Sequence, residues 1–258
     1  MISQKAYAKV NIFLKVTGKR ADGYHLIASR FMVVEDLFDI VSFKKKDFSH
    51  SFCLEGEFTC KTSQNTVYKA YTALLEYTNS EKLREYFYEH KVVVEKNIPA
   101  FAGLGGGSSD AAAFLKMCNE VCDLRLAVEE LSDIGAKVGA DVPFFVYGYK
   151  SANVTGVGEI VEKFDEESLH VNTFTPRIEI STPAVYKEYS QNFYAPLSKE
   201  KIVTILQTPS SEILLKLTRE EANDLYLPAK KLYPSLIEYE RDGWFFSGSG
   251  SSFFQTKA

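Results

Sequence analysis

The stretch Pro99-Ala100-Phe101-Ala102-Gly103-Leu104-Gly105-Gly106-Gly107-Ser108-Ser109-Asp110 lies between a β-branched run at residues 92–94 and a segment with helical character that begins near Ser109. Its glycines carry no Cβ, so the backbone can adopt positive φ values and approach a ligand closely. Ser108 and Ser109 add hydroxyl donors where the first amides of a helix lack intrahelical partners. Such amides attract phosphate oxygens. The order of strand, glycine-rich loop and helix therefore predicts a phosphate site at residues 99–109.

The segment after this loop has the periodicity of an amphipathic helix rather than of a linker. Apolar side chains recur at i, i+3, i+4, i+7 and i+8, at Phe114, Met117, Cys118, Val121 and Cys122. No Gly-Lys-Ser/Thr follows the glycines, which excludes a Walker A loop, and no acidic residue is placed as in a Rossmann unit. The loop therefore indicates a different class of phosphate-binding protein.

Five stretches carry a resemblance to a known family. Residues 99–112 resemble the second motif of the GHMP kinase superfamily, and Ser247-Gly-Ser-Gly-Ser-Ser252 resembles its third motif. Three segments resemble the branch that phosphorylates 4-diphosphocytidyl-2-C-methyl-D-erythritol in non-mevalonate isoprenoid synthesis: Ala8-Lys-Val-Asn-Ile-Phe-Leu14, Arg20-Ala-Asp-Gly-Tyr-His-Leu26 and Gly139-Ala-Asp-Val-Pro-Phe-Phe145. The matches span nearly the whole chain in the expected order.

The resemblance implies an α+β protein with the two-domain GHMP kinase fold. Its N-terminal domain is expected to be ribosomal protein S5 domain 2-like, and its C-terminal domain ferredoxin-like. An acidic run at residues 165–167 indicates the boundary. We expect domain 1–165 to carry the ATP-binding loop and the catalytic residues, and domain 166–258 to close the substrate cleft.

Composition restricts the partners. The 258 residues have a formal net charge of −4, which gives no general attraction for nucleic acid or for an anionic membrane. The N-terminal residues lack the apolar core of a signal peptide, and no apolar run has the length of a membrane span. The cysteines at 53, 60, 118 and 122 show no metal-binding spacing. We therefore expect a cytoplasmic protein with reduced thiols that acts on small molecules.

Two residues are candidates for catalysis. Alternation over residues 6–16 predicts a strand with Lys9 and Asn11 on one face. Lys9 alone is compatible with a solvated strand lysine, and Asp141, beside Pro143, with a turn former. The resemblance instead implies that Lys9 and Asp141 are catalytic and that Asn11 and Asp141 contact the phosphoryl acceptor.

The resemblance also implies the two binding sites. It places Tyr24, His25 and Tyr186 against the cytosine of the substrate, although the first two also fit a surface turn and Tyr186 fits a core position. ATP is expected on the loop, and Asn65 near its adenosine, although helix capping alone explains Asn65. The cofactor-binding residues are thus Asn65, Pro99, Ala100, Phe101, Ala102, Gly103, Leu104, Gly105, Gly106, Gly107, Ser108 and Ser109.

The implied reaction moves the γ-phosphoryl group of ATP to the 2-hydroxyl of the acceptor, with Mg²⁺ neutralising the phosphates. No protein ligands for Mg²⁺ are predicted. One alternative is a mevalonate or homoserine type of GHMP kinase, which has no use for aromatic rings that stack on a base. The other is a catalytically silent nucleotide-binding protein of the same fold, which the presence of Lys9 and Asp141 disfavours.

Periodicity predicts the remaining elements. A turn at residues 18–25 and a second at 156–159 each join two strands. Helices are expected after Asn65, from Thr182, and over residues 128–138, where Gly139 is a candidate C′ residue. Further strands are expected at residues 31–43, 48–60, 178–181, 244–246 and 253–254.

Overall fold

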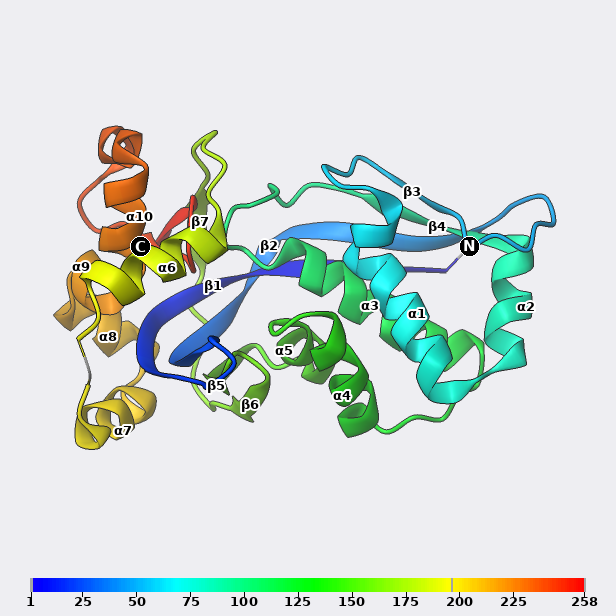
Figure 1. The fold of residues 1–258 in the computed structure, drawn as a ribbon, viewed down its shortest axis with the longest axis horizontal. Helices are drawn as coiled ribbons and strands as arrows, with labels where there is room; N and C mark the ends of the chain where they lie inside the picture. The colour runs from blue at the N-terminus through cyan, green and yellow to red at the C-terminus, as the bar shows by residue number, and fades with distance from the viewer. Residues whose placement is uncertain (1, 196, 258) are drawn as a thin grey trace. The chain divides into compact units, whose positions relative to one another are not determined.

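A computed structural model describes residues 2–195 and 197–257, which form two compact units (Figure 1). Unit 1 contains the residues up to Ala8, Glu35–Ala100 and Gly105–Gly148, and unit 2 contains Lys9–Val34, Phe101–Leu104 and the residues from Tyr149 onward. The long strands β1 (Ile2–Lys19) and β2 (His25–Lys45) contribute to both units. The units interleave along the chain, whereas the division into 1–165 and 166–258 cuts it once. That division stays a prediction.

The strands of unit 1 pair around the C-terminal part of β2. It runs antiparallel to β4 (His90–Glu95), and β3 (Leu54–Gly56) lies parallel to β4. The predicted strand at residues 48–60 is thus wrong except for these three residues of β3. Outside β3 the segment makes only single backbone bonds to the rest of the described residues, from the Ser49 N–H to the Tyr88 carbonyl and from the Val92 N–H to the Cys53 carbonyl, both at 2.9 Å. The Phe52 ring stacks on Tyr71 with centroids 4.2 Å apart, so side-chain packing also holds this segment.

The helices of unit 1 gather around α3, against which α1, α4 and α5 pack (Figure 1). Helix α3 starts at Gly106, before the predicted Ser109, because Gly105 takes the N-cap position with a left-handed φ of +72°. The predicted apolar stripe is confirmed, since Phe114, Met117 and Cys118 are buried. The elements are η1 (Thr62–Gln64), α1 (Thr66–Thr78), α2 (Glu81–Glu89), α3 (Gly106–Val121), α4 (Val128–Val138) and α5 (Val142–Tyr147).

Gly139 ends α4 but does not take the left-handed C′ conformation that we expected. Its φ of −176° is extended, and its N–H bonds to the Gly135 carbonyl at 3.1 Å. The Val142 N–H then bonds to the Gly139 carbonyl at 3.1 Å. The chain therefore turns directly from α4 into α5, which leaves no room for a separate left-handed cap.

Unit 2 begins with the predicted turn between β1 and β2, in which the Arg20 N–H bonds to the Tyr24 carbonyl at 2.7 Å. The N-terminal part of β2 pairs antiparallel with β5 (Ser151–Gly156), and β5 with β6 (Ile160–Lys163), which confirms the predicted turn at residues 156–159. A second sheet has the order β7-β9-β8. Its strands β7 (Val171–Phe174), β8 (Phe245–Phe246) and β9 (Phe253–Thr256) include both strands predicted around the third glycine motif.

The core of unit 2 explains why residues 178–181 are not a strand. Ile180 is buried with Val185, Tyr226 and Phe253, and the Ile178 N–H bonds locally to the Pro176 carbonyl at 2.8 Å. The prediction of a strand at residues 178–181 is therefore wrong: Ile178 and Ile180 pack into the core of unit 2 and form no strand. The helix predicted from Thr182 is confirmed as α6 (Thr182–Asn192); the others are α7 (Lys199–Gln207), α8 (Ser210–Lys216), α9 (Arg219–Ala222), α10 (Tyr226–Leu232) and η2 (Pro234–Tyr239).

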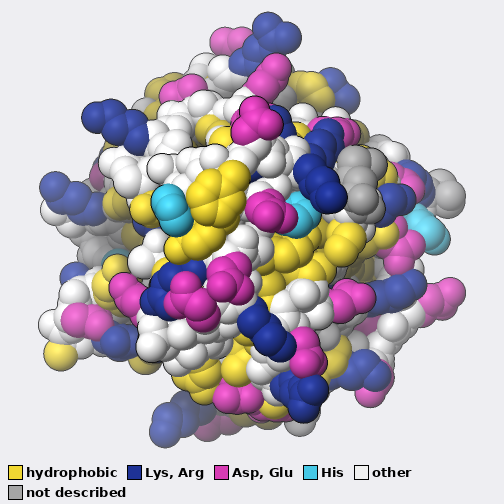
Figure 2. Space-filling view, turned by 90° about the vertical axis from the view of Figure 1, so that its right-hand side faces the viewer, with side chains coloured by type: hydrophobic (Ala, Val, Ile, Leu, Met, Phe, Trp, Pro, Cys, Tyr) yellow, Lys and Arg dark blue, Asp and Glu magenta, His cyan; other side chains and the backbone are white. Residues whose placement is uncertain are grey.

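The surface agrees with the small net charge. On the face shown in Figure 2, acidic and basic side chains are interspersed, and hydrophobic side chains form small patches between them. In the part of the chain that the structure describes, no helix is long and apolar enough to cross a membrane.

Candidate active site

Lys9 and Asn11 are buried in unit 2, with 3% and 2% of their surfaces exposed. The Lys9 Nζ donates to Asn11 Oδ1 at 2.7 Å and to the Gly103 carbonyl at 3.2 Å, and lies 4.4 Å from the centroid of the Phe31 ring. A buried ammonium needs such hydrogen bonds to replace water. Lys9 is therefore not a solvated strand lysine, and its catalytic role stays a prediction.

The Gly103 carbonyl contacts both Lys9 on β1 and the third glycine motif. This carbonyl accepts from Ser247 Oγ at 3.0 Å, and the φ of Gly103 is +72°. A Cβ at Gly103 would lie 2.2 Å from the Ser247 carbonyl oxygen, which no side chain tolerates. The Lys9 N–H bonds to the Leu104 carbonyl at 2.9 Å, and the Ser252 N–H to the Ala102 carbonyl at 3.1 Å. Three motifs that are far apart in the sequence thus meet within unit 2.

Asn223, which was not predicted to be a site residue, forms hydrogen bonds to the backbone of the third motif. The buried amide of Asn223 donates to the carbonyls of Phe246 and Gly248, both at 2.9 Å. The Asn11 N–H donates to Ser247 Oγ at 3.3 Å. Asn223 therefore positions the backbone of the motif that contacts Gly103.

The part of the loop that belongs to unit 1 forms the N-terminus of α3. The first helical bond there runs from the Ser109 N–H to the Gly105 carbonyl at 2.9 Å, so the amides of residues 106–108 precede it. The Gly107 carbonyl accepts from Thr66 Oγ1 at 2.6 Å. A Cβ at Gly106 would lie 2.9 Å from Ile98 Cγ2, so this glycine is required by packing inside the protein.

The beginning of the loop is more open. Pro99, Ala100 and Phe101 are exposed, and Phe101 has a positive φ of +53°. Ala102 and Leu104 are buried, and so is Ser109, whereas Ser108 is half-buried. The outer part of residues 99–109 is thus accessible, and its contacts with ATP stay a prediction.

Asn65 is the N-cap of α1. Its Oδ1 accepts from the Val67 N–H at 2.8 Å. The capping interpretation is confirmed, and the adenosine contact stays a prediction.

Asp141 is the N-cap residue of α5 and is partly buried in unit 1. Its side chain accepts no capping hydrogen bond from α5, as the described residues show. The structure therefore places this carboxylate at the start of α5 without a capping hydrogen bond to that helix. Its role as a base stays a prediction.

The residues predicted for the cytosine pocket partly come together. The His25 and Tyr186 rings stack with centroids 5.1 Å apart and an interplanar angle of 23°, and His25 Nε2 is hydrogen-bonded to Ser190 Oγ. Burial and the nearby Lys19 lower the pKa of His25, which favours a neutral ring at pH 7. Tyr186 also packs against the core of unit 2, so it is both a ring partner and a core residue. Tyr24 is 65% exposed, and its contact with the cytosine stays a prediction.

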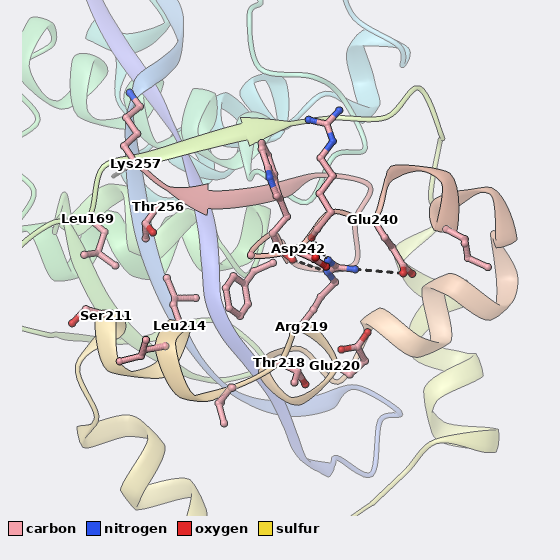
Figure 3. A pocket seen from close by; sticks show the side chains of 17 residues that line it. Leu169, Ser211, Leu214, Thr218, Arg219, Glu220, Glu240, Asp242, Thr256 and Lys257 are labelled. Atoms are coloured by element: carbon pink, nitrogen blue, oxygen red, sulfur yellow. Dashed lines mark hydrogen bonds and ion pairs between the residues drawn. The ribbon is translucent and has the colours of Figure 1, made fainter.

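A separate cavity of about 1070 Å³ lies in unit 2 (Figure 3). Arg219 at its wall donates to the carbonyls of Trp244 and Arg241, both at 2.6 Å, and pairs with Glu240 at 3.7 Å. Its charge is thus satisfied by the protein itself. None of the predicted site residues is among those that line this cavity.

The chain is similar in sequence to proteins of known family. Residues 65–149 match the family model of the GHMP kinases N terminal domain. The chain is 54% identical over 256 residues to the 4-diphosphocytidyl-2-C-methyl-D-erythritol kinase of Sulfurimonas denitrificans, which covers 98% of this chain and 96% of the relative. The chain belongs to this kinase family. The family's enzyme from Sulfurovum sp. is 47% identical over the full length of both chains.

A solved structure of the family agrees with the fold. The crystal structure of a 4-(cytidine 5'-diphospho)-2C-methyl-D-erythritol kinase superposes with a TM-score of 0.74 at 29% identity, over 99% of this chain and 90% of the other. The predicted α+β GHMP kinase fold is therefore confirmed, as is the resemblance from which it came.

Proposed function

We propose that the chain transfers the γ-phosphoryl group of ATP to the 2-hydroxyl of 4-diphosphocytidyl-2-C-methyl-D-erythritol. The observation that carries the substrate assignment is the stack of His25 on Tyr186, which joins the start of β2 to α6. Aromatic and imidazole rings favour a flat base, through stacking and hydrogen bonds to its edge. A mevalonate or homoserine acceptor contains no base. Relatives 54% and 47% identical to the chain bear the name of this kinase.

ATP is the phosphoryl donor expected of the family, and we assign its phosphates to the glycine-rich loop. The support is the N-terminus of α3, where the amides of residues 106–108 precede the first helical bond. Backbone amides and the helix dipole both stabilise phosphate oxygens there. The Lys9 ammonium, held on the Gly103 carbonyl, would offset the negative charge that develops on the transferred group.

The chemistry requires a base, because the pKa of an alcohol lies far above 7. We assign this role to Asp141, which lies at the start of α5 and matches the catalytic aspartate that the family resemblance implies. As the bond from the 2-oxygen to phosphorus forms and the bond from phosphorus to the ADP oxygen breaks, the hydroxyl proton passes to the carboxylate. Asn11, which holds the Lys9 ammonium at 2.7 Å, would orient the acceptor beside it.

Mg²⁺ is expected to bind through the phosphates of ATP. In the described part of the chain no group of three or more His, Cys, Asp or Glu side chains is arranged to hold a metal. Mg²⁺ keeps several waters and commonly binds substrate phosphates with few protein ligands. The phosphate oxygens of ATP and water would therefore be its main ligands. A cytoplasmic location is also part of the proposal, because the free thiols of Cys53 and Cys60 suit a reducing compartment.

The test is the product formed from a panel of acceptors. The purified protein is incubated with MgATP and, separately, the cytidine substrate, mevalonate or homoserine, and products are identified by phosphorus NMR and mass spectrometry. We expect one added phosphoryl group on the cytidine substrate alone. Phosphorylation of mevalonate or homoserine would assign the protein to another GHMP activity. Binding of ATP without turnover of any acceptor would favour a silent nucleotide-binding protein.

A further inference from the structure

Two carboxylates and one lysine form a buried cluster beneath the glycine-rich loop in unit 1. Lys96 follows β4, Asp39 lies on β2 and Asp110 on α3. The Lys96 Nζ donates to Asp110 Oδ2 at 2.7 Å and also to Asp39 Oδ2. Asp39 is completely buried, and Asp110 is 2% exposed. The cluster is unusual because two buried acidic side chains share one cation, the Lys96 ammonium, whose side chain is 17% exposed.

The cluster ties together the two ends of the loop. The other Asp39 oxygen accepts the N–H groups of Asn97 and Ile98, the latter at 2.8 Å, just before Pro99. Asp110 follows the glycines in α3. A Cβ at Gly106 would lie 3.5 Å from Asp39 Oδ2, so the cluster is directly behind the first helical residue of the loop. Through Lys96, the chain that enters the loop and the helix that leaves it are held in one arrangement.

The cluster contains two carboxyl groups and only one ammonium group, so its net charge depends on whether both carboxyl groups are ionised. Asp110 Oδ1 is buried and has no hydrogen-bond partner among the described residues. Burial raises the pKa of Asp110 to about 7; the two charged groups that act on it are Lys96, which lowers the pKa, and Asp39, which raises it. Burial lowers the pKa of Lys96, but the two carboxylates outweigh this, so it stays protonated. The cluster is therefore neutral when Asp110 is protonated and carries one negative charge when Asp110 is ionised.

We propose that Asp39, Lys96 and Asp110 are positioning residues for ATP, and that binding of the triphosphate to the loop is accompanied by proton uptake on Asp110. This inference rests on the proposed function, which places the phosphates at the loop. A polyanion brought to the N-terminus of α3 disfavours a second negative charge beneath it, and so favours the protonated acid. By linkage, ATP binds most tightly below pH 7, and its affinity falls as the pH rises through the range in which free Asp110 ionises.

The test measures protons directly and needs no turnover. MgATP binding is followed by titration calorimetry in two buffers of different ionisation enthalpy between pH 6 and 9, for the wild type and Asp110→Asn. Asparagine keeps the size of the side chain and removes its titration. If binding raises the Asp110 pKa by one unit, the wild-type affinity falls by about tenfold across this range relative to Asp110→Asn. Titration of ATP itself is common to both proteins and cancels in the comparison.

Two further variants separate positioning from general stability. Asp123→Asn removes an exposed carboxylate just past the other end of α3 and should bind protons and MgATP like the wild type. Lys96→Met should raise the KM for ATP by about tenfold or more with a smaller change in kcat, and Lys96→Arg should recover most of the loss. Equal proton uptake and equal pH slopes in the wild type and Asp110→Asn would overturn the inference while the proposed function stands. No binding of MgATP by the folded wild type would overturn both.

Discussion

Gly103→Ala tests whether the close contact between the second and third glycine motifs is required. The added Cβ would lie 2.2 Å from the Ser247 carbonyl oxygen, on a residue whose φ is +72°. Gly243→Ala is the matched control, because its φ is +75° and nothing lies within 4 Å of the added Cβ. Both variants carry the left-handed backbone strain, about 1–2 kcal/mol for alanine. Only Gly103→Ala carries the overlap.

The additional cost follows from what must move. Relief of the overlap displaces the Ser247 backbone, whose carbonyl accepts the Gly250 N–H and whose N–H bonds to the Ser252 carbonyl, both at 3.0 Å. Two such bonds contribute about 2 kcal/mol in net terms. In a chain of this size we therefore expect Gly103→Ala to unfold about 4–8 °C below Gly243→Ala.

The same displacement should impair activity. The Gly103 carbonyl is an acceptor of the Lys9 ammonium at 3.2 Å, so its shift moves the lysine relative to the loop. Misplacement by about 1 Å commonly costs on the order of 100-fold in rate, and we expect kcat/KM for ATP to fall about 10–100-fold. Thermal unfolding followed by circular dichroism and steady-state kinetics measure the two effects. Similar melting temperatures and similar kinetics for both variants would show that the contact is dispensable.

Three other predictions concern the site. Asp141→Asn should lower kcat by about 10²–10⁴-fold while both substrates still bind, and adding Lys9→Met should cost less than the sum of the two single effects in free energy; near-normal turnover of Asp141→Asn would exclude the base. Tyr186→Ala should raise the KM for the cytidine substrate but hardly change the use of an acceptor that lacks cytosine; equal losses on both would leave Tyr186 a core residue only. Because burial lowers the pKa of His25 below 6.5, the unfolded chain binds this proton more readily. The free energy of unfolding should therefore fall as the pH drops below about 6.5, and fall less in His25→Gln; denaturant titrations with identical slopes for both proteins would refute this.

The sequence predicted correctly those elements that depend on residues close together in the chain. The apolar stripe of α3, the Asn65 cap of α1 and the Asp-Gly turn before His25 each involve neighbours within a few residues. These features depend on backbone geometry and burial of one face, which a single sequence records directly. The same reasoning failed at residues 48–60 and 178–181. There, apolar side chains pack on partners distant in the sequence, and burial without sheet pairing gives the same pattern as a strand.

Contacts between distant residues were also what the site prediction lacked. Lys96 reads as a charged residue at the end of a strand, yet it bonds to Asp39, 57 positions away. No role was predicted for Arg30, yet it is fully buried, with its Nε donating to Asn153 at 2.7 Å and its guanidinium 3.3 Å from the centre of the Phe164 ring. A charge placed in a core is indistinguishable from a solvated one until the partner that stabilises it is known.

Glycine is required at positions 103 and 106 of the loop by packing within the protein, and not only by the approach of a ligand. Glycine was expected at positions 103 and 106 because a ligand approaches the backbone closely. In the structure the neighbours that exclude a side chain are the Ser247 carbonyl at Gly103 and the Ile98 side chain at Gly106. Packing against the protein fixes the backbone path, and the fixed path in turn presents the amides of residues 106–108 at the start of α3. The requirement for glycine therefore exists before any nucleotide binds, so substitutions at these two positions should lower the stability of the free protein as well as its affinity for ATP.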